Sequence, residues 1–319
     1  MSAKSYTLNN GVSMPAIAFG GWGGLTDKDR EQFGPTFGLA LKEGFRHIDG
    51  AWVYRTEKQL AEQIRKSGIP REELFIATKL PFHHCDRVKE FFEDSLKVLG
   101  LDYIDLYLMH GPVAWMDTNP VGEEFPFPDG KTQLYDTTVN KTWSKMEELL
   151  ETGKVRAIGV SNFSTKTLTQ LLKTAKVVPA VNQVEIHPYL AQQELLDFCN
   201  KNGIHITAYS PTGRRLERED PLIKELAVKY DVTPTQIILG WALARGVSIA
   251  TQSKKELHRK HTLNLPELDP EDVKKITALD RKQFAYLQLD KYGTVRGWTP
   301  EQYGWEHLKM SDVGGMFDT

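Results

Sequence analysis

The sequence predicts a (β/α)8 TIM barrel, an α/β fold in which eight parallel strands close into a barrel and each is followed by a helix. Short runs rich in apolar and β-branched residues alternate with amphipathic helical segments along most of the chain. Such strands form a parallel sheet with both faces covered, and eight strand–helix pairs favour a closed barrel over an open doubly wound sheet. The length of 319 residues suits one barrel, and no linker rich in Pro, Gly or Ser divides it.

The predicted strands are short and mostly apolar. In order, they are residues 16–20, 46–50, 74–80, 103–110, 155–162, 180–186, 205–211 and 247–251. A hairpin is expected before the first strand. The segments between the strands have the apolar periodicity of helices that cover a core. We expect helices near residues 29–43, 56–66, 86–99, 139–152, 165–174, 191–201, 234–245 and 270–280.

Two segments are longer than the barrel repeat requires. Residues 111–138 form a long loop after the fourth strand, and residues 283–319 form an extended C-terminal loop. On a barrel, loops that follow strands lie on the face that carries active sites. We predict one domain over residues 1–319, with the C-terminal loop over the barrel mouth. Its aromatic residues are interpreted equally well as a packing strap or as a lid that shapes a substrate pocket.

Composition narrows the class of protein. The formal net charge is −2, with 40 basic and 42 acidic residues and no block of like charge, so neither nucleic acid nor a membrane is an expected partner. The two cysteines, Cys85 and Cys199, suit a reducing compartment. The first residues lack the apolar core of a signal peptide, and we expect a cytoplasmic protein. We expect a monomer or a homodimer.

Ionisable side chains stand at three successive predicted strand ends. Asp49 ends the second strand, Lys79 the third and His110 the fourth, while Tyr54 lies in the loop after the second. Each one alone has an ordinary structural interpretation, as a turn cap, a solvated charge or a buried histidine. Together they favour an active site, because the carboxyl ends of barrel strands converge on one face.

The chemistry of these four groups is that of a general acid. A phenol titrates near pH 10, and a nearby ammonium lowers that value, while a carboxylate keeps the ammonium charged and in place. Tyr54 could therefore protonate an alkoxide as it forms, tuned by Lys79 and Asp49, while His110 orients the carbonyl oxygen. Such a site needs a hydride donor, either a nicotinamide or a flavin. The stretch H-H-C at residues 83–85 has no second cluster at a matching spacing, so no metal is expected.

Polar groups at later strand ends are candidates for binding that donor. Ser161, Asn162 and Gln183 can hydrogen-bond a carboxamide, and Tyr209 can stack on a ring. Each could instead satisfy buried backbone groups. F-G-G-W-G-G at residues 19–24 lacks the G-x-G-x-x-G pattern, and we interpret it as a tight turn rather than a phosphate site.

These stretches resemble the motifs of the aldo-keto reductase superfamily. H-I-D-G-A-W-V-Y, T-K-L, L-Y-L-M-H, G-K-V-R-A-I-G-V-S-N-F, N-Q-V-E-I-H-P-Y and A-Y-S-P occur in the family's order over roughly residues 6–280. The general appearance is closest to fungal aldose and xylose reductase-like members. The resemblance implies reversible reduction of an aldehyde or aldose sugar with NADP(H), or sometimes NAD(H), and Tyr54 as the proton donor.

The resemblance also implies roles for further residues. The carboxamide would be held by Ser161, Asn162 and Gln183, and Tyr209 would stack on the nicotinamide. Ser210, followed by Pro211, would lie near the pyrophosphate, and Trp22 would line the substrate pocket.

Two departures from the family pattern affect the cofactor and the pocket. Where the family often has Lys and Arg for the adenosine 2′-phosphate, this chain has Gln252 and His258, while Ser253 matches. Arg259, Lys254 and Lys255 lie close enough to substitute, so we favour NADP(H) and keep NAD(H) or dual use open. Gly111 replaces a frequent Trp. That side of the pocket is expected to be roomier unless Trp115 or Phe125 folds in, and Trp298 of the C-terminal loop is a further pocket candidate.

Other functions stay open on sequence alone. The barrel could be a regulatory, nicotinamide-binding subunit with little turnover, or it could work as an NAD-dependent polyol or alcohol dehydrogenase. A metal-dependent hydrolase on the same fold is a third class. The four ionisable residues together favour the reductase.

Overall fold

The computed structural model describes residues 4–82, 85–113, 138–287 and 299–305. Its centre is a closed barrel of parallel strands in the order β10-β3-β4-β5-β6-β7-β8-β9, which confirms the predicted fold class. Each strand lies within a run predicted from the sequence. The strands are β3 (Ile17–Gly20), β4 (His47–Asp49), β5 (Phe75–Leu80), β6 (Ile104–Met109), β7 (Val155–Ser161), β8 (Val181–Glu185), β9 (His205–Tyr209) and β10 (Ser248–Thr251).

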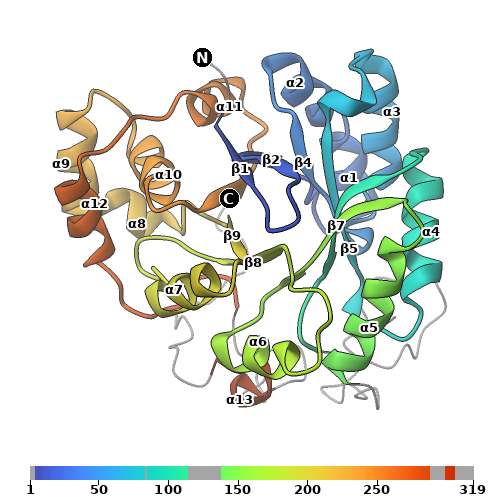
Figure 1. Ribbon diagram of the computed structural model, residues 1–319. Helices are drawn as coiled ribbons and strands as arrows, with labels where there is room; N and C mark the ends of the chain where they lie inside the picture. Colours follow the sequence, from blue (N-terminus) through green and yellow to red (C-terminus); the bar gives the residue numbers. More distant parts are fainter. Residues whose placement is uncertain (1–3, 83–84, 114–137, 288–298, 306–319) are drawn as a thin grey trace.

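Helices surround the barrel (Figure 1). The longer ones are α1 (Asp27–Phe33), α2 (Pro35–Glu43), α3 (Glu57–Ser67), α4 (Val88–Leu99), α5 (Val139–Leu150), α6 (Thr165–Leu172), α7 (Gln193–Lys201), α9 (Pro221–Lys229), α10 (Pro234–Ala244), α11 (Glu256–Leu263) and α12 (Pro270–Thr277). Short helices are α8 (Arg215–Glu219), α13 (Pro300–Tyr303) and the 3-10 turns η1 (Trp52–Tyr54) and η2 (Arg71–Glu73).

The helix expected near residues 29–43 is in fact two helices. α1 begins at a capping box formed by Thr26 and Asp29 and ends at Gly34. Pro35 then opens α2, because proline has no N–H to continue the preceding hydrogen-bond ladder but suits a first helical turn. Helices α8, α9 and α11 were not predicted, although Asp220 caps α9 directly before Pro221, which is a recognisable start signal.

A hairpin packs against the N-terminal end of the barrel. The expected hairpin is present as β1 (Ser5–Thr7) paired with β2 (Ser13–Pro15), and it lies within the ring of helices in Figure 1. Hairpin and barrel side chains form one buried cluster, made of Leu8, Met14, Phe75, Ala77, Leu106, Leu108, Ala157, Ala180 and Val181. The barrel is therefore a solid core, and the polar strand ends stand at its other end.

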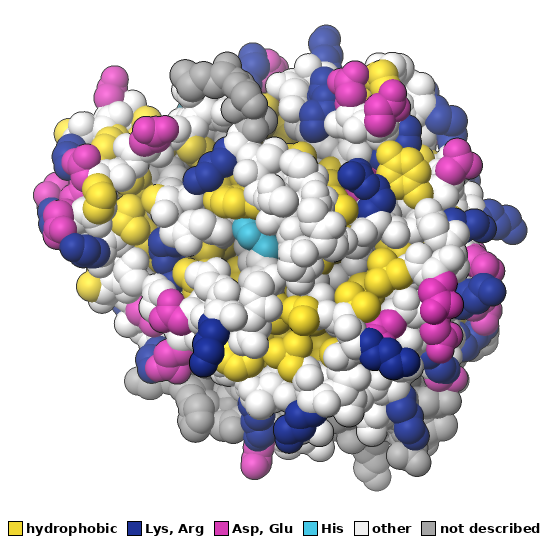
Figure 2. Space-filling model, viewed as in Figure 1, with side chains coloured by type: hydrophobic (Ala, Val, Ile, Leu, Met, Phe, Trp, Pro, Cys, Tyr) yellow, Lys and Arg dark blue, Asp and Glu magenta, His cyan; other side chains and the backbone are white. Residues whose placement is uncertain are grey.

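Charged side chains of both signs occur together on the face that Figure 2 shows, mostly around a largely uncharged centre. Among the described residues, no helix is both long and apolar enough to cross a bilayer.

Candidate active site

Lys79 lies at the carboxyl end of β5 and is held by a carboxylate from the adjacent strand β4. Its Nζ lies 2.9 Å from each carboxylate oxygen of Asp49 and donates to the Gly50 carbonyl at 2.6 Å. Tyr54, at the end of η1, forms a side-chain hydrogen bond with Lys79. The three groups predicted to form a tuned acid are therefore in direct contact.

The electrostatics of Lys79 keep its amine charged. Lys79 is 0% exposed and Asp49 is 4% exposed. Burial alone would lower the pKa of Lys79, but attraction to Asp49 and Tyr54 outweighs burial and raises it above the ordinary value. Because the attraction between Lys79 and Tyr54 is mutual, the ammonium also favours the phenolate form of Tyr54.

Two further aromatic residues border Tyr54. The ring centroids of Tyr54 and His110 are 5.6 Å apart, and those of Tyr54 and Trp22 are 5.3 Å apart. All three side chains are half-buried, whereas Lys79 and Asp49 are closed off from solvent. Tyr54 is therefore more exposed than the ion pair that supports it.

Phe82 is a neighbour of Gly111 and His110 that the sequence did not suggest. Phe82 stacks on the His110 ring, with centroids 4.7 Å apart. A Cβ atom on Gly111 would lie only 2.5 Å from the Phe82 ring, so Phe82 occupies the space directly beside Gly111. Nothing in the sequence pattern singled out Phe82. Trp115, Phe125 and Trp298 lie outside the described residues.

The candidate carboxamide-binding residues form a connected group at the ends of β7, β8 and β9. Asn162 donates to the His110 carbonyl at 2.9 Å, and its side-chain oxygen accepts from the Tyr209 hydroxyl at 2.8 Å. Ser161 donates to the Gln183 carbonyl at 2.8 Å, and the Gln183 amide donates to Asp49 at 2.9 Å. Gln183 thus connects this group to the Lys79 ion pair.

The backbone around this group is held in an unusual conformation. Arg55, Asn162 and Ser210 have φ values of 53°, 63° and 48°, a left-handed region that side-chain-bearing residues rarely adopt. Each follows directly on a candidate site residue, and Ser210 precedes the buried Pro211. Such conformations persist only where the surroundings impose them, and they are common at binding sites.

The candidate residues after β10 lie apart, at the rim. The exposed Gln252 side chain donates to the Trp22 carbonyl at 3.0 Å. The Ser253 hydroxyl lies 3.3 Å from His258 Nδ1. Partial burial and the neighbouring Lys255, His261 and Arg218 lower the pKa of His258. Lys254 and Lys255 are exposed beside it.

Arg259 is not at the rim, contrary to expectation. It is 2% exposed, and its guanidinium forms a two-pronged ion pair with Glu43 of α2, with both N–O distances at 2.7 Å. Its remaining bonds go to the Ser253 and Lys254 carbonyls. Arg259 therefore holds the β10–α11 loop in place, whereas Lys254 and Lys255 are exposed to solvent.

Part of the C-terminal loop reaches the candidate site. Trp305 is buried, stacks edge-on against Phe284 and donates to the Asn162 carbonyl at 3.3 Å. The described part of this loop therefore packs like a strap, as one of the two interpretations expected. For metals, residues 4–82, 85–113, 138–287 and 299–305 contain no cluster of His, Cys, Asp and Glu that could hold an ion, and His83 and His84 are not described.

Comparisons with known proteins agree with this geometry. Residues 16–281 match the model described as the Aldo/keto reductase family. The chain is 39% identical to a D-galacturonate reductase of Hypocrea jecorina, over 92% of this chain and 95% of that protein. It is 37% identical to an NADPH-dependent D-xylose reductase of Candida boidinii, over 88% and 94%. An aldose reductase structure from Schistosoma japonicum superposes with a TM-score of 0.83 at 28% identity, covering 92% of this chain and 98% of that one.

Proposed function

Since the chain belongs to the aldo/keto reductase family, as its motifs indicated, we propose that it reduces an aldehyde or aldose sugar to the alcohol with NADPH. The observation that carries the proposal is the buried Lys79–Asp49 ion pair in contact with the half-buried Tyr54. A binding or structural role has no need of a buried cation beneath a phenol. A general acid does need such a cation, because the phenol must give up its proton near neutral pH.

The residues at the barrel mouth fit an extended nicotinamide dinucleotide. Amide and hydroxyl groups at the ends of β7 and β8 lie next to the Lys79 ion pair, where a carboxamide would bring the ring close to Tyr54. The half-buried Tyr209 offers an aromatic face. Exposed cations beside Ser253 suit a phosphate at the other end of the cofactor.

In the proposed reaction, the residues of this chain orient the carbonyl and supply a proton. The reduced nicotinamide, when bound, supplies a hydride to the carbonyl carbon. Tyr54 donates its hydroxyl proton to the carbonyl oxygen as negative charge develops there, and Lys79 stabilises the phenolate that remains. His110 lies across from Tyr54 and would hydrogen-bond the same oxygen. Solvent then returns a proton to Tyr54, and the reverse sequence oxidises an alcohol.

The substrate class rests on the relatives and on the pocket. The relatives described above are named as reductases of D-galacturonate, D-xylose and aldoses. The half-buried Trp22 and His110 offer flat aromatic faces on either side of Tyr54, against which the C–H faces of a sugar chain can pack. We therefore propose an aldose or sugar acid over a purely aliphatic aldehyde.

The cofactor is proposed to be NADP(H) rather than NAD(H). Lys254 and Lys255 remain exposed at the start of α11, and the C. boidinii relative is named as NADPH-dependent. The test compares kcat/KM with NADPH and NADH on one aldose. A clear preference for NADH would refute the choice of cofactor without affecting the proposed reaction.

The general acid is tested by Tyr54→Phe. Removal of the hydroxyl should lower kcat by about 10²–10⁴-fold, the usual contribution of a positioned acid. NADPH binding, followed by quenching of protein fluorescence, should persist because the ring remains. If Tyr54→Phe reduced an aldose at the wild-type rate, another group would be the proton donor.

We also place the protein in a reducing compartment such as the cytoplasm. Cys85 and Cys199 are both buried free thiols. Burial raises the pKa of each to about 12, so neither is suited to thiolate chemistry. The assembly is proposed to be a monomer or homodimer, which sedimentation would decide.

A further inference from the structure

A buried carboxyl group lies three residues after Tyr54, outside the site described above. Glu57 is the first residue of α3 and is 5% exposed. One of its oxygens accepts a hydrogen bond from the Thr78 hydroxyl at 2.7 Å. Thr78 is 1% exposed and directly precedes Lys79 on β5, so this bond joins the segment after Tyr54 to the strand that carries its cation. The proposed reaction uses neither Glu57 nor Thr78.

The side chains around Glu57 belong to the layer between the barrel and its helices. Side chains alternate along β5, so Lys79 points into the barrel end while Thr78 points outwards, to α3. Helix α4 lies beside α3 (Figure 1) and contributes Ser95, while Tyr107 is the partner of Thr78 on the adjacent strand β6. Ser95 and Tyr107 are 0% exposed, and neither hydroxyl forms an aligned hydrogen bond with the described residues. The carboxyl group of Glu57 therefore lies among hydroxyl groups.

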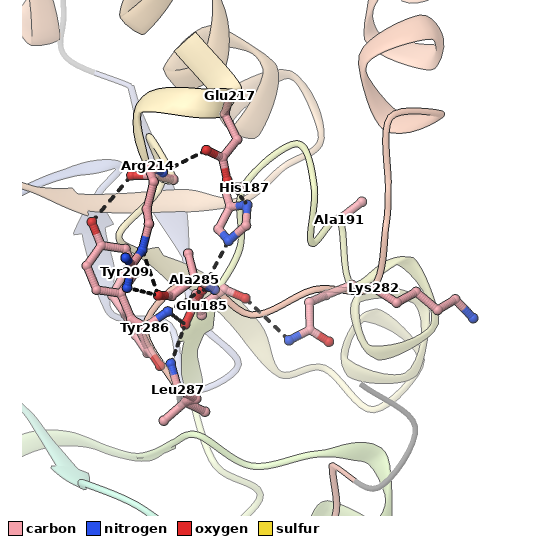
Figure 3. Close-up of polar contacts among 12 residues, drawn as sticks. Glu185, His187, Ala191, Tyr209, Arg214, Glu217, Lys282, Ala285, Tyr286 and Leu287 are labelled. Carbon is pink, nitrogen blue, oxygen red and sulfur yellow. Dashed lines mark hydrogen bonds and ion pairs between the residues drawn. The ribbon is translucent and has the colours of Figure 1, made fainter. Parts of the chain in front are cut away.

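Other buried carboxylates of this chain have N–H or cationic partners. Figure 3 shows Glu185, at the end of β8, which accepts backbone N–H bonds from residues 285–287 at 2.6–3.2 Å and lies 3.0 Å from His187 Nε2. Asp105 forms ion pairs with two arginines, at 2.6 and 2.7 Å. Among the described residues, Glu57 has a hydroxyl as its partner instead.

These surroundings allow Glu57 to gain a proton near neutral pH. Burial raises the pKa of Glu57 to about 7, although hydrogen bonding with the Thr78 and Ser95 hydroxyls lowers it. The carboxylate of Asp94, on α4, adds to the rise in this pKa. Tyr107 stays a neutral phenol, because burial and then the charge of Glu57 raise its pKa well above the ordinary value. A charged acceptor forms a stronger hydrogen bond than a neutral one, so the bond from Thr78 weakens when Glu57 is protonated.

Side-chain hydrogen bonds hold the segment that carries Tyr54 on both sides. Before Tyr54, the Trp52 indole donates to a carboxylate oxygen on α4 at 2.8 Å. After it, Thr56 donates to a backbone carbonyl beyond β3 at 2.8 Å. Of these three bonds, the one from Thr78 to Glu57 is the one that reaches β5, the strand that carries the cation. Weakening it would let the phenol move relative to its ammonium.

We infer that Glu57 is a positioning residue: its carboxylate, held by Thr78, fixes the contact between Tyr54 and its ammonium, and protonation of Glu57 loosens this contact and slows the chemical step. The inference rests on the proposed function. It assigns Glu57 no contact with substrate or cofactor. It makes the rate of reduction depend on pH in the neutral range through a group that lies outside the site.

Single-turnover hydride transfer from NADPH to D-xylose or D-galacturonate tests the inference across the neutral range. In wild type the rate should fall as pH falls through about 7. The fall should be about fivefold, the usual difference between hydrogen bonds to charged and to neutral acceptors. Glu57→Gln is neutral at every pH, so it should show the low rate of acidic wild type throughout, with no step in this range. Thr78→Val removes the donor and should be at least as slow.

A double variant shows whether the two residues act through one contact. Glu57→Gln combined with Thr78→Val should be no slower than Thr78→Val, because both changes affect the same hydrogen bond. If Glu57→Gln does not fold, Thr78→Val still breaks this bond, since valine is β-branched like threonine and suits a strand.

The ionisation of Tyr54 in the cofactor-free protein is an independent readout. The ultraviolet absorbance of each protein, minus that of its Tyr54→Phe counterpart, reports the titration of this phenol alone. In Thr78→Val the phenol should ionise at higher pH than in wild type, because it has moved away from the ammonium. Glu57→Gln should change in the same direction, whereas the loss of a negative charge alone would favour the phenolate.

The matched control is Glu62→Gln. Glu62 is on the same helix, but its side chain is 50% exposed and pairs with Lys66 on the surface. The rate profile of this variant and its Tyr54 titration should match those of wild type.

Two results would overturn the inference alone. One is a wild-type rate without a step in the neutral range, or a step that persists in Glu57→Gln. The other is a Tyr54 titration that is unchanged in Thr78→Val. A wild-type protein that reduced neither sugar with NADPH would overturn the proposed function, while the titration of Tyr54 would still test the positioning.

Discussion

Lys79 shows how a cation is kept inside a protein next to the group that it tunes. Removing an ammonium from water costs several kcal/mol, and this cost is offset only when a close partner and further hydrogen bonds are present. Asp49 and the Gly50 carbonyl supply both. Since the pKa of Lys79 is raised, its contribution to stability is fully present below pH ~10 and is lost only as pH rises through the higher folded value. The ammonium therefore stays charged over the neutral range.

Lys79→Met should separate the chemical role of this cation from its structural role. The single-turnover rate should fall about 100-fold or more, because Tyr54 loses the charge that stabilises its phenolate. Stability should fall by roughly 3–5 kcal/mol, because Asp49 is left buried without its cation. Both quantities are measurable, by stopped-flow absorbance and by urea unfolding.

A second substitution distinguishes the two roles. Adding Asp49→Asn removes the uncompensated charge, so the double variant should regain much of the lost stability but none of the rate. A double variant that turned over like wild type would show that Lys79 acts only through folding.

Contacts between single residues could be predicted where the two residues lie at the ends of neighbouring strands. Asp49 and Lys79 could be paired from the sequence because adjacent parallel strands end on the same face. Arg259 could not be placed in this way, since its partner Glu43 is 216 positions away and only the packing of α11 on α2 brings them together. Phe82 was missed for the same reason: its contact with Gly111 depends on loop geometry rather than on a strand pattern.

At the scale of single elements, the alternation of side chains along each strand explains which residues reach the site. In β8, Gln183 and Glu185 point into the barrel end, while Val184 belongs to the core cluster that packs against the helices. The period of two was available in the sequence, and it would have added Glu185 to the inward-facing set. What the Glu185 carboxylate binds could not be read in this way, because residues 285–287 have no strand or helix pattern.

Helix α11 depends on α2 for its position, and this dependence is testable through Glu43→Gln. Without the carboxylate, the buried Arg259 keeps only its carbonyl bonds, and the loop at Ser253 and Lys254 should loosen. Stability should fall by about 1–3 kcal/mol, the cost of a buried group left poorly paired. If this loop faces the 2′-phosphate, the Kd for NADPH should rise about fivefold, a loss of about 1 kcal/mol.

The control for Glu43→Gln is a substitution in an exposed ion pair of α11. Glu256 pairs with Lys260 on its exposed face, with side chains 65% and 60% exposed, so Glu256→Gln should change neither stability nor affinity measurably. Fluorescence titration of both variants with NADPH and NADH measures these affinities. An equal loss for both cofactors in Glu43→Gln would mean that this loop does not discriminate the phosphate.

For the whole molecule, the repeat of strand and helix was enough to predict the barrel and the position of every strand in it. The repeat could not show α8 and α9, which precede α10 between β9 and β10, where the simple pattern has one helix, nor α11, which precedes α12. Nor could it show what the predicted hairpin contacts at the N-terminal end. There the hairpin meets a polar layer inside the barrel: the rings of Tyr6 and His205 are 4.5 Å apart, and His47 Nδ1 lies 2.9 Å from the Pro15 carbonyl.

The histidines of this layer contribute a loss of barrel stability in acid. Burial, and secondarily the neighbouring His47, lower the pKa of His205 to about 4. Between pH ~6.5 and 4 the unfolded chain therefore binds a proton that the folded chain does not, and stability falls as pH falls through that window. For one histidine, the loss between pH 7.5 and 5 should be about 2 kcal/mol. Burial also lowers the pKa of His47, which acts in the same direction.

Urea unfolding of His205→Gln at pH 7.5 and 5 tests the contribution of His205 to this loss of stability. The variant must be compared with wild type because Glu57 has an opposing effect. Burial raises the pKa of Glu57 to about 7. The folded chain thus binds the extra proton between pH ~4.5 and 7, which stabilises it as pH falls and masks the histidine in wild type. His205→Gln should lose about 2 kcal/mol less than wild type on acidification, and Glu57→Gln should lose more. If all three proteins lost the same stability, the titration of these buried groups would not be what limits the barrel in acid.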